Sequence, residues 1–290
     1  HTSEGGFLVS TLTDTSGLKM SFVDQDGNAY GVRHVDNKPR VSSMPYLYDI
    51  AEGSIPGHNS FHKIGYNPDV DNLLEDLWSV GGLYVFPTAG MQMEVVSSSN
   101  SDDGSPAGMG VRTVKLCYLD SNYIEQTEII TLNGTTVVPT VATNILRIQR
   151  FYTNTVGSSG VAVGNIDIRH LSNTPIYARI MTGYNSSRQT VWTVPAGKTL
   201  YIVSWQASIG NASGGRMAEF RLEATTMGDV YTAGVFQTKS LSIIQDGTVF
   251  LPCYIPIKCP AYTDIKISVI SDNSTANAIC GGYFSGWVES

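Results

Sequence analysis

The chain has 290 residues, of which 42% are hydrophobic and only 15% are charged, and its net charge is −7. This composition is sufficient for a hydrophobic core and argues against disorder, and the length predicts about two domains. No apolar run reaches the ~20 residues of a membrane helix, and no cluster of Lys and Arg supports contact with phosphates, so we expect neither a membrane span nor a nucleic-acid partner. Because the chain starts at His1 with neither an initiator Met nor a leader, we expect it to begin after a segment that was trimmed or is not included.

The chain is predicted to consist almost entirely of β-strands. Short β-branched and aromatic runs are bounded by Gly, Asn, Asp, Ser and Pro, which is typical of strands and turns. The run 199–207 alternates, with apolar residues on both faces, as in a strand covered on both sides. The expected strands are 18–23, 28–35, 83–86, 92–97, 111–119, 124–131, 145–152, 161–169, 177–181, 190–194, 199–208, 216–225, 249–257, 263–271 and 279–288.

Residues 70–78 are the only stretch with helical spacing, with Leu73, Leu74, Leu77 and Trp78 on one face and Asp69 as N-cap. The fold class we expect is therefore all-β, with two β-sandwich or jelly-roll-like domains, an extended N-terminal arm and one short helix.

Turn residues and prolines divide the chain into three predicted regions. Residues 1–56 hold a hairpin around Asp26-Gly27 and then an extended, proline-punctuated arm. Residues 57–170 form a β-rich sandwich domain, and residues 171–290 form a C-terminal jelly-roll-like domain that begins at a cluster of turn residues.

Two segments have partial metal-site patterns. Asp24–Asn28 begins like a calcium loop, but the downstream bidentate Glu is missing, and an Asp-Gly hairpin explains the same residues. His58 and His62 have the i, i+4 spacing that brings two imidazoles to one metal on a helix, but the preceding Pro-Gly pair favours a loop. Cys253 and Cys259 lack CxxC spacing. We expect no metal and no cofactor, and we interpret the four cysteines mainly as buried apolar residues.

The catalytic patterns are equally incomplete. Asp69, Asp71, Glu75 and Asp76 include enough carboxylates for glycoside hydrolysis, which needs an acid and a base or nucleophile. Their place at the start of the predicted helix gives a simpler explanation, because negative charge is stabilised there. No nucleophile elbow, P-loop or dinucleotide fingerprint is present, so we predict no catalytic residues and no enzyme activity.

The four Trp residues, with 15 Tyr and 9 Phe, have two interpretations. They could form a sugar-stacking platform, but their alternation favours a sandwich core or a subunit interface.

Six stretches carry a resemblance to a known class of proteins: Ala29–Gly53, Lys63–Asn67, Glu75–Trp78, Ile124–Glu128, Thr131–Thr135 and Gly164–Arg169. Over roughly residues 25 to 170, they resemble virion structural proteins of tailed bacteriophages. Val194–Ile202 also resembles a strand opening common in phage jelly-roll modules. The resemblance implies a component of a virus particle and supplies no catalytic residues.

Within that class we expect a non-enzymatic capsid decoration (cement) protein that binds and stabilises the phage head. The alternative is a tail fibre, spike or receptor-binding protein, with a host glycan as ligand, although no repetitive or coiled-coil shaft is present. The expected partners are the major capsid protein or other virion proteins, contacted by apolar residues of the arm. These predicted partner-binding residues are Val41, Met44, Tyr46, Leu47 and Ile50.

The resemblance also implies a location. We expect assembly in the host cytoplasm and exposure on the particle surface.

The composition also suggests an oligomeric state. A low-charge β-rich chain with an arm suits a homo-oligomer, and we favour a trimer.

Overall fold

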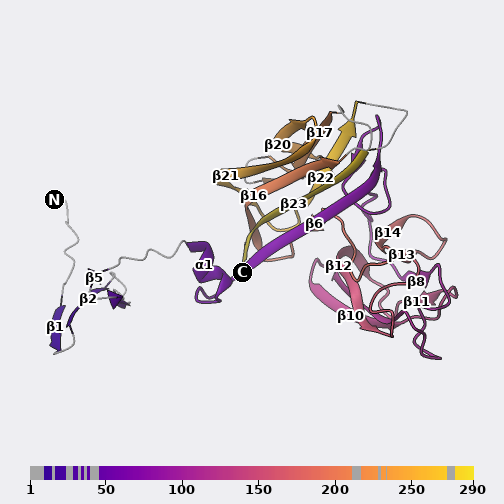
Figure 1. The fold of residues 1–290 in the computed structure, drawn as a ribbon, viewed down its shortest axis with the longest axis horizontal. Helices are drawn as coiled ribbons and strands as arrows, with labels where there is room; N and C mark the ends of the chain where they lie inside the picture. Colours follow the sequence, from indigo (N-terminus) through magenta and orange to yellow (C-terminus); the bar gives the residue numbers. More distant parts are fainter. Residues whose placement is uncertain are drawn as a thin grey trace. The chain divides into compact units, whose positions relative to one another are not determined.

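The computed structural model describes residues 46–210, 217–227, 230–232, 234–272 and 278–290, together with the backbone of strands within residues 10–39. The chain divides into two compact units, residues 1–55 and residues 56–290. The structure confirms an all-β fold (Figure 1). No helix in the described part of the chain is long and apolar enough to cross a membrane.

The N-terminal unit contains two small sheets and a helix. Strands β1 (Ser10–Asp14), β2 (Gly17–Val23) and β3 (Ala29–Gly31) form an antiparallel sheet. Val23 pairs with Ala29, so β2 and β3 are antiparallel neighbours, and the turn of the predicted hairpin lies outside the described residues. Strands β4 (His34–Val35) and β5 (Lys38–Pro39) form a second pair. Residues Tyr46–Ala51, within the predicted arm, form helix α1.

The first sandwich of the larger unit consists of two antiparallel sheets. One has the strand order β21-β16-β23-β6, and the other has the order β15-β22-β17-β20, with β7 also paired to β22 (Figure 1). The bounds are β6 (His58–Val70), β7 (Glu75–Asp76), β15 (Trp192–Thr193), β16 (Thr199–Gly210), β17 (Ala218–Ala224), β20 (Gln237–Ile244), β21 (Gly247–Cys259), β22 (Asp264–Ser271) and β23 (Ala278–Glu289).

Both sheets contribute to one core, in which Trp205, Phe220 and Phe284 are fully buried. The strands contribute alternate side chains to this core, because every second residue of a strand points to the same face of the sheet. We call this cluster the first core.

The second sandwich also has two antiparallel sheets, with strand orders β10-β9-β12 and β11-β8-β13-β14. Met93, Leu116 and Phe151 are buried between them, in what we call the second core. The predicted boundary between residues 170 and 171 falls between β13 and β14, which are hydrogen-bonded neighbours. The bounds are β8 (Met93–Ser97), β9 (Val111–Asp120), β10 (Glu125–Thr131), β11 (Val138–Pro139), β12 (Ile145–Val156), β13 (Ile166–His170) and β14 (Ile176–Ile180).

One predicted helix and one predicted strand are absent from the structure. Residues 70–78 form no helix, because β6 ends at Val70 and β7 pairs with β22. The four apolar residues of that stretch do not share a face: Leu77 packs into the first core, Trp78 into the second, and Leu73 is 66% exposed. Residues 83–86 form no strand. One short pair, β18 (Thr226–Met227) with β19 (Val230–Tyr231), completes the set of described strands.

Candidate functional site

The predicted partner-binding residues fall into two groups. Val41 and Met44 lie outside the described residues. Tyr46 and Leu47 are 46% and 43% exposed on helix α1, whereas Ile50 on the same helix is only 3% exposed. The helix therefore presents Tyr46 and Leu47 to solvent. The calcium-like segment 24–28 also lies outside the described residues.

His58 and His62 lie on strand β6 rather than in a loop, so that expectation is wrong. A strand rises ~3.3 Å per residue, so residues four apart are ~13 Å apart and cannot share a metal ion. His58 contacts Glu289 at 3.0 Å, and the His62 ring lies 4.6 Å from the Tyr283 ring. Within the described ranges, no group of three or more His, Cys, Asp or Glu could hold a metal.

No helix begins at the four acidic residues, so their interpretation as helix N-terminal charges is wrong; Asp69 is exposed on β6, and the other three organise a loop and a buried cluster. Asp71 Oδ1 accepts the Leu73 N–H at 2.7 Å, and Glu75 accepts the Gly82 N–H at 2.6 Å. Asp76 is fully buried and pairs with Lys266.

The four cysteines are free thiols, and two of them are buried. Burial raises the pKa of Cys259 to about 12 and that of Cys280 to about 12, so both stay protonated at neutral pH. Cys117 and Cys253 are partly exposed.

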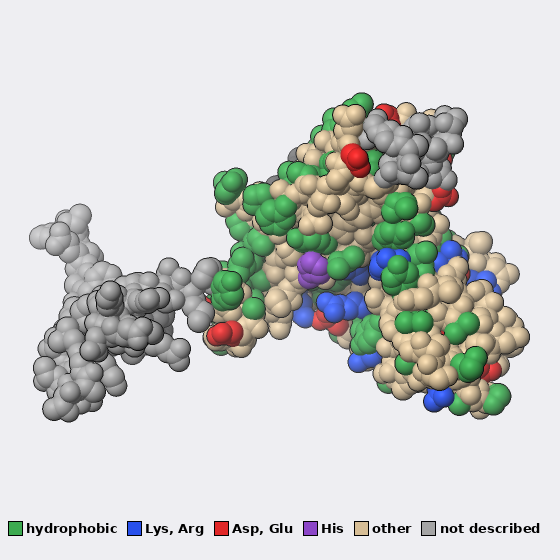
Figure 2. Space-filling view, in the orientation of Figure 1, with side chains coloured by type: hydrophobic (Ala, Val, Ile, Leu, Met, Phe, Trp, Pro, Cys, Tyr) green, Lys and Arg blue, Asp and Glu red, His purple; other side chains and the backbone are tan. Residues whose placement is uncertain are grey.

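A basic groove runs between β6 and β12 where the two sandwiches meet. Its cavity of about 550 Å³ is lined on one side by His62, Lys63 and Ile64, and on the other by Arg150 and by the segment from Asn185 to Arg188. Figure 2 shows a histidine and several Lys or Arg side chains gathered in this region. Lys63 points inward from β6, and its ammonium donates to the Gln149 carbonyl oxygen of β12.

The groove is positively charged and lacks an internal counter-charge. Among the described residues, no carboxylate forms an ion pair with Lys63, Arg150 or Arg188. Burial, with a smaller contribution from the Arg150 charge, lowers the pKa of Lys63 to about 7. The same two causes lower the pKa of His62. An anion in the groove would relieve this repulsion.

Aromatic rings hold Arg188 at one end of the basic groove. Its guanidinium carbon lies 3.7 Å from the centre of the Tyr184 ring and 4.1 Å from that of the Tyr66 ring. Its Nε atom is buried and has no hydrogen-bond partner in the described part of the chain. A preorganised guanidinium of this kind suits a planar carboxylate or a sulfate.

A second surface lies along the neighbouring edge strands β20 and β21. Opposite the single residue Val203, β21 carries the four residues from Cys253 to Pro256, three more than regular pairing would place there, and they form a bulge. Tyr254 and Ile255 in this bulge are 95% and 86% exposed. Figure 2 shows hydrophobic side chains over this part of the molecule. We call the set the β20–β21 edge surface; its members are Leu241, Ile243, Phe250, Tyr254 and Ile255, all exposed.

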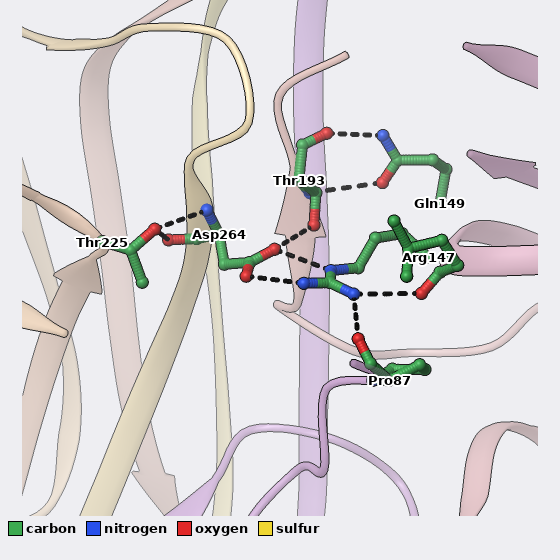
Figure 3. Close-up of polar contacts among 7 residues, drawn as sticks. Pro87, Arg147, Gln149, Thr193, Thr225 and Asp264 are labelled. Atoms are coloured by element: carbon green, nitrogen blue, oxygen red, sulfur yellow. Dashed lines mark hydrogen bonds and ion pairs between the residues drawn. The ribbon is translucent and has the colours of Figure 1, made fainter. Parts of the chain in front are cut away.

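A buried polar junction connects the two sandwiches (Figure 3). Arg147 of β12 forms two bonds with the carboxylate of Asp264, at the start of β22. Asp264 also accepts the Thr193 hydroxyl, and Gln149 exchanges two hydrogen bonds with the Thr193 backbone. This network fixes β12 against β15 and β22, and so positions the wall of the basic groove.

Sequence reasoning missed the groove residues Lys63, Arg150 and Arg188. One signal was available for Lys63: it follows Phe61 at a spacing of two, which places both on the same face of a strand. No local pattern marks Arg150 and Arg188, because they come together only when distant segments of the chain pack against each other.

No family model matches the chain, and no curated protein matches it. Among solved structures it is similar to the VP2 subviral particle of infectious bursal disease virus, with 10% identity, 85% of this chain and 77% of the other covered, and a TM-score of 0.22. The structure of the Gx strain of the same virus gives 11% identity, coverage of 84% and 76%, and a TM-score of 0.20. At TM-scores this low, the matches do not establish a shared fold.

Proposed function

We propose that this chain is a non-enzymatic virion structural protein of a tailed bacteriophage. The observation that carries the proposal is the β20–β21 edge surface. Monomeric proteins rarely leave an edge strand both apolar and uncovered, because such an edge invites association. Tyr254 and Ile255, almost fully exposed, are the side chains that a neighbouring subunit would bury. The sequence resemblance over roughly residues 25 to 170 supports the same class.

Within this class we favour a capsid decoration protein that binds the major capsid protein on the particle surface. Two features support this choice. Residues 1–55 form a unit separate from the β body, as a bridging arm requires, and helix α1 exposes Tyr46 and Leu47. Burial of these side chains at ~25 cal/mol per Å² of apolar area would offset the cost of ordering the arm. A homotrimer would multiply the attachment points and raise avidity.

The copy number of the protein in purified virions tests this choice. Quantitative mass spectrometry against the major capsid protein is expected to give hundreds of copies per virion. About a dozen copies would instead indicate a location at the tail or at a capsid vertex.

Deletion of the arm tests how the protein attaches. In a binding assay with particles that lack the protein, deletion of residues 25–53 is expected to abolish attachment. The purified body, residues 56–290, serves as the control for folding.

The basic groove supports a second candidate, a receptor-binding virion protein that recognises an acidic host glycan. Arg150 supplies a charge and Arg188 a guanidinium held between Tyr66 and Tyr184, a combination that suits a sugar carboxylate or sulfate. A glycan array enriched in sialylated, uronic and sulfated saccharides tests it. Binding should disappear in Arg150→Ala and Arg188→Ala and persist in Arg221→Ala, on the distant strand β17. An array without hits contradicts this candidate and leaves the structural role intact.

A further inference from the structure

Three ionisable side chains meet on one face of the β15-β22-β17-β20 sheet. Residues Ile265, Ile267 and Val269 of β22 point into the first core, so the alternate residue Lys266 points to the opposite face. Glu223 of β17 lies directly opposite Lys266 in the sheet register. Asp76 lies on the other neighbour, β7, opposite Ser268. Lys266 is therefore placed between two carboxylates on adjacent strands.

The contacts within this trio are close. Lys266 Nζ lies 2.9 Å from Asp76 Oδ1 and 3.8 Å from Glu223 Oε2. Asp76 Oδ1 faces the Lys266 ammonium, and no other group among the described residues donates a hydrogen bond to it. The other oxygen, Oδ2, accepts the Tyr84 N–H at 2.7 Å. Glu223 is held by the Ser268 hydroxyl at 2.8 Å. The Asp76 carboxyl is thus fixed at one oxygen and open to the lysine at the other.

The trio is largely buried and lies beside an aromatic ring. The side chain of Asp76 is completely buried, and those of Lys266 and Glu223 are only 10% and 11% exposed. The Phe236 ring lies 4.7 Å from Lys266 Nζ. Burial is the main cause that raises the pKa of Asp76, against the opposing effect of Lys266. A medium of low polarity favours a neutral amine and a neutral acid over an ion pair.

We propose that Lys266 and Asp76 join in an intramolecular isopeptide bond, with Glu223 as the proton carrier. After a proton passes from the ammonium to the carboxylate, the neutral amine attacks Cγ of the protonated Asp76. The bond between Nζ and Cγ forms, and the bond between Cγ and one Oδ breaks. Glu223 takes a proton from the attacking nitrogen and returns it to the departing hydroxyl. The ion pair is converted into a neutral amide and one water molecule, and Glu223 ends in the state in which it began.

The geometry favours this step. Cγ lies one covalent bond beyond Oδ1, and a small side-chain rotation can bring it and Nζ to the ~3–3.5 Å separation of a near-attack conformer. The Tyr84 N–H at Oδ2 would polarise the carbonyl during attack. The product would link β7 covalently to β22, two strands that are far apart in the sequence. Such a link lowers the conformational entropy of the unfolded chain and so stabilises the fold.

Mass spectrometry of the purified full chain tests the proposal directly. The denatured protein is expected to be lighter than its sequence by the mass of one water molecule. Trypsin cleaves after Lys63, Arg112 and Lys258 but not after an acylated lysine. We therefore expect a branched product in which peptide 259–290 is attached to peptide 64–112. A full-mass protein that releases peptide 259–266 would overturn the proposal.

Variants distinguish the link from other losses of water. Lys266→Arg and Glu223→Gln are expected to restore the full mass, whereas Lys239→Arg, on the neighbouring strand β20, is expected to keep the deficit. Water lost at an Asp-Gly pair would leave the two peptides unconnected, which contradicts the proposal. If the Glu223→Gln protein is folded by circular dichroism and still contains the cross-link, then Glu223 is not the proton carrier. The wild-type mass decides the central point even if a variant does not fold.

Discussion

The guanidinium of Arg147 and the carboxylate of Asp264 form a parallel two-bond pair across the junction of the two sandwiches. The Nε–Oδ1 distance is 2.8 Å and the Nη2–Oδ2 distance is 3.0 Å, and the two side chains are only 8% and 5% exposed. A pair of this kind contributes geometric specificity because both donors must be aligned at once.

Removal of one partner of this pair should be strongly destabilising. Arg147→Met leaves the Asp264 charge buried without its partner, so we expect the free energy of unfolding to fall by about 3–5 kcal/mol. The double variant Arg147→Met with Asp264→Leu should lose less than the single variant, because no buried charge remains. Urea titration measures both. If the two variants are equally unstable, the cost arises from lost packing rather than from an unpaired charge.

Lys63 should make stability depend on pH at neutral to alkaline values. Its pKa is about 7 in the folded protein and 10.5 in a free side chain, so between these values the unfolded state binds more protons. Stability should therefore rise with pH across this window, by at most about 1.4 kcal/mol per pH unit. Below pH 7 both states are protonated and the penalty is constant. The measurement is the difference in unfolding free energy between wild type and Lys63→Met across this range, with Lys198→Met, whose wild-type side chain is 28% exposed, as the control. A difference that does not change with pH would contradict the prediction.

Gly65 should not tolerate a side chain. A Cβ atom there would lie 2.3 Å from the Leu77 carbonyl oxygen and 2.8 Å from the Thr190 nitrogen. These two atoms share a hydrogen bond of 2.9 Å, which the added methyl group would push apart. We expect Gly65→Ala to destabilise the protein by about 1–3 kcal/mol. Gly210→Ala is the control, because its Cβ would come no closer than 3.9 Å to an atom of the described residues beyond its chain neighbours, and it should stay within about 0.5 kcal/mol of wild type in thermal unfolding.

The β20–β21 edge surface should matter for association and not for folding. Because Tyr254 and Ile255 are almost fully exposed, the double variant Tyr254→Ser with Ile255→Ser should change the unfolding free energy by no more than about 0.5 kcal/mol. Its self-association, followed by light scattering after size-exclusion chromatography, and its binding to particles should weaken. Val141→Ser, a residue 87% exposed on the second sandwich, should leave both unchanged. Equal behaviour of the two variants would exclude this surface as the interface.

Strand content was readable from the sequence wherever apolar residues alternate. Strands β9, β12, β16, β17, β22 and β23 overlap their predicted ranges because a strand between two layers must fill its inward positions with apolar side chains. Strand β6 was not predicted, although it has 13 residues, because its buried positions include Lys63, Gly65 and Asn67. These residues are buried because other segments accept hydrogen bonds from Lys63 and Asn67 or pack closely against Gly65. No local sequence pattern predicts such partners.

The all-β class could be predicted from the amino-acid sequence, since hydrophobic period and turn chemistry are local properties. The tertiary structure was needed to find that Leu77 and Trp78 enter different cores and that Lys63, Arg150 and Arg188 share a groove. It also placed Asp76 beside Lys266. The reason is physical: a strand fixes which face a residue occupies, but the pairing of strands far apart in sequence fixes which residues meet.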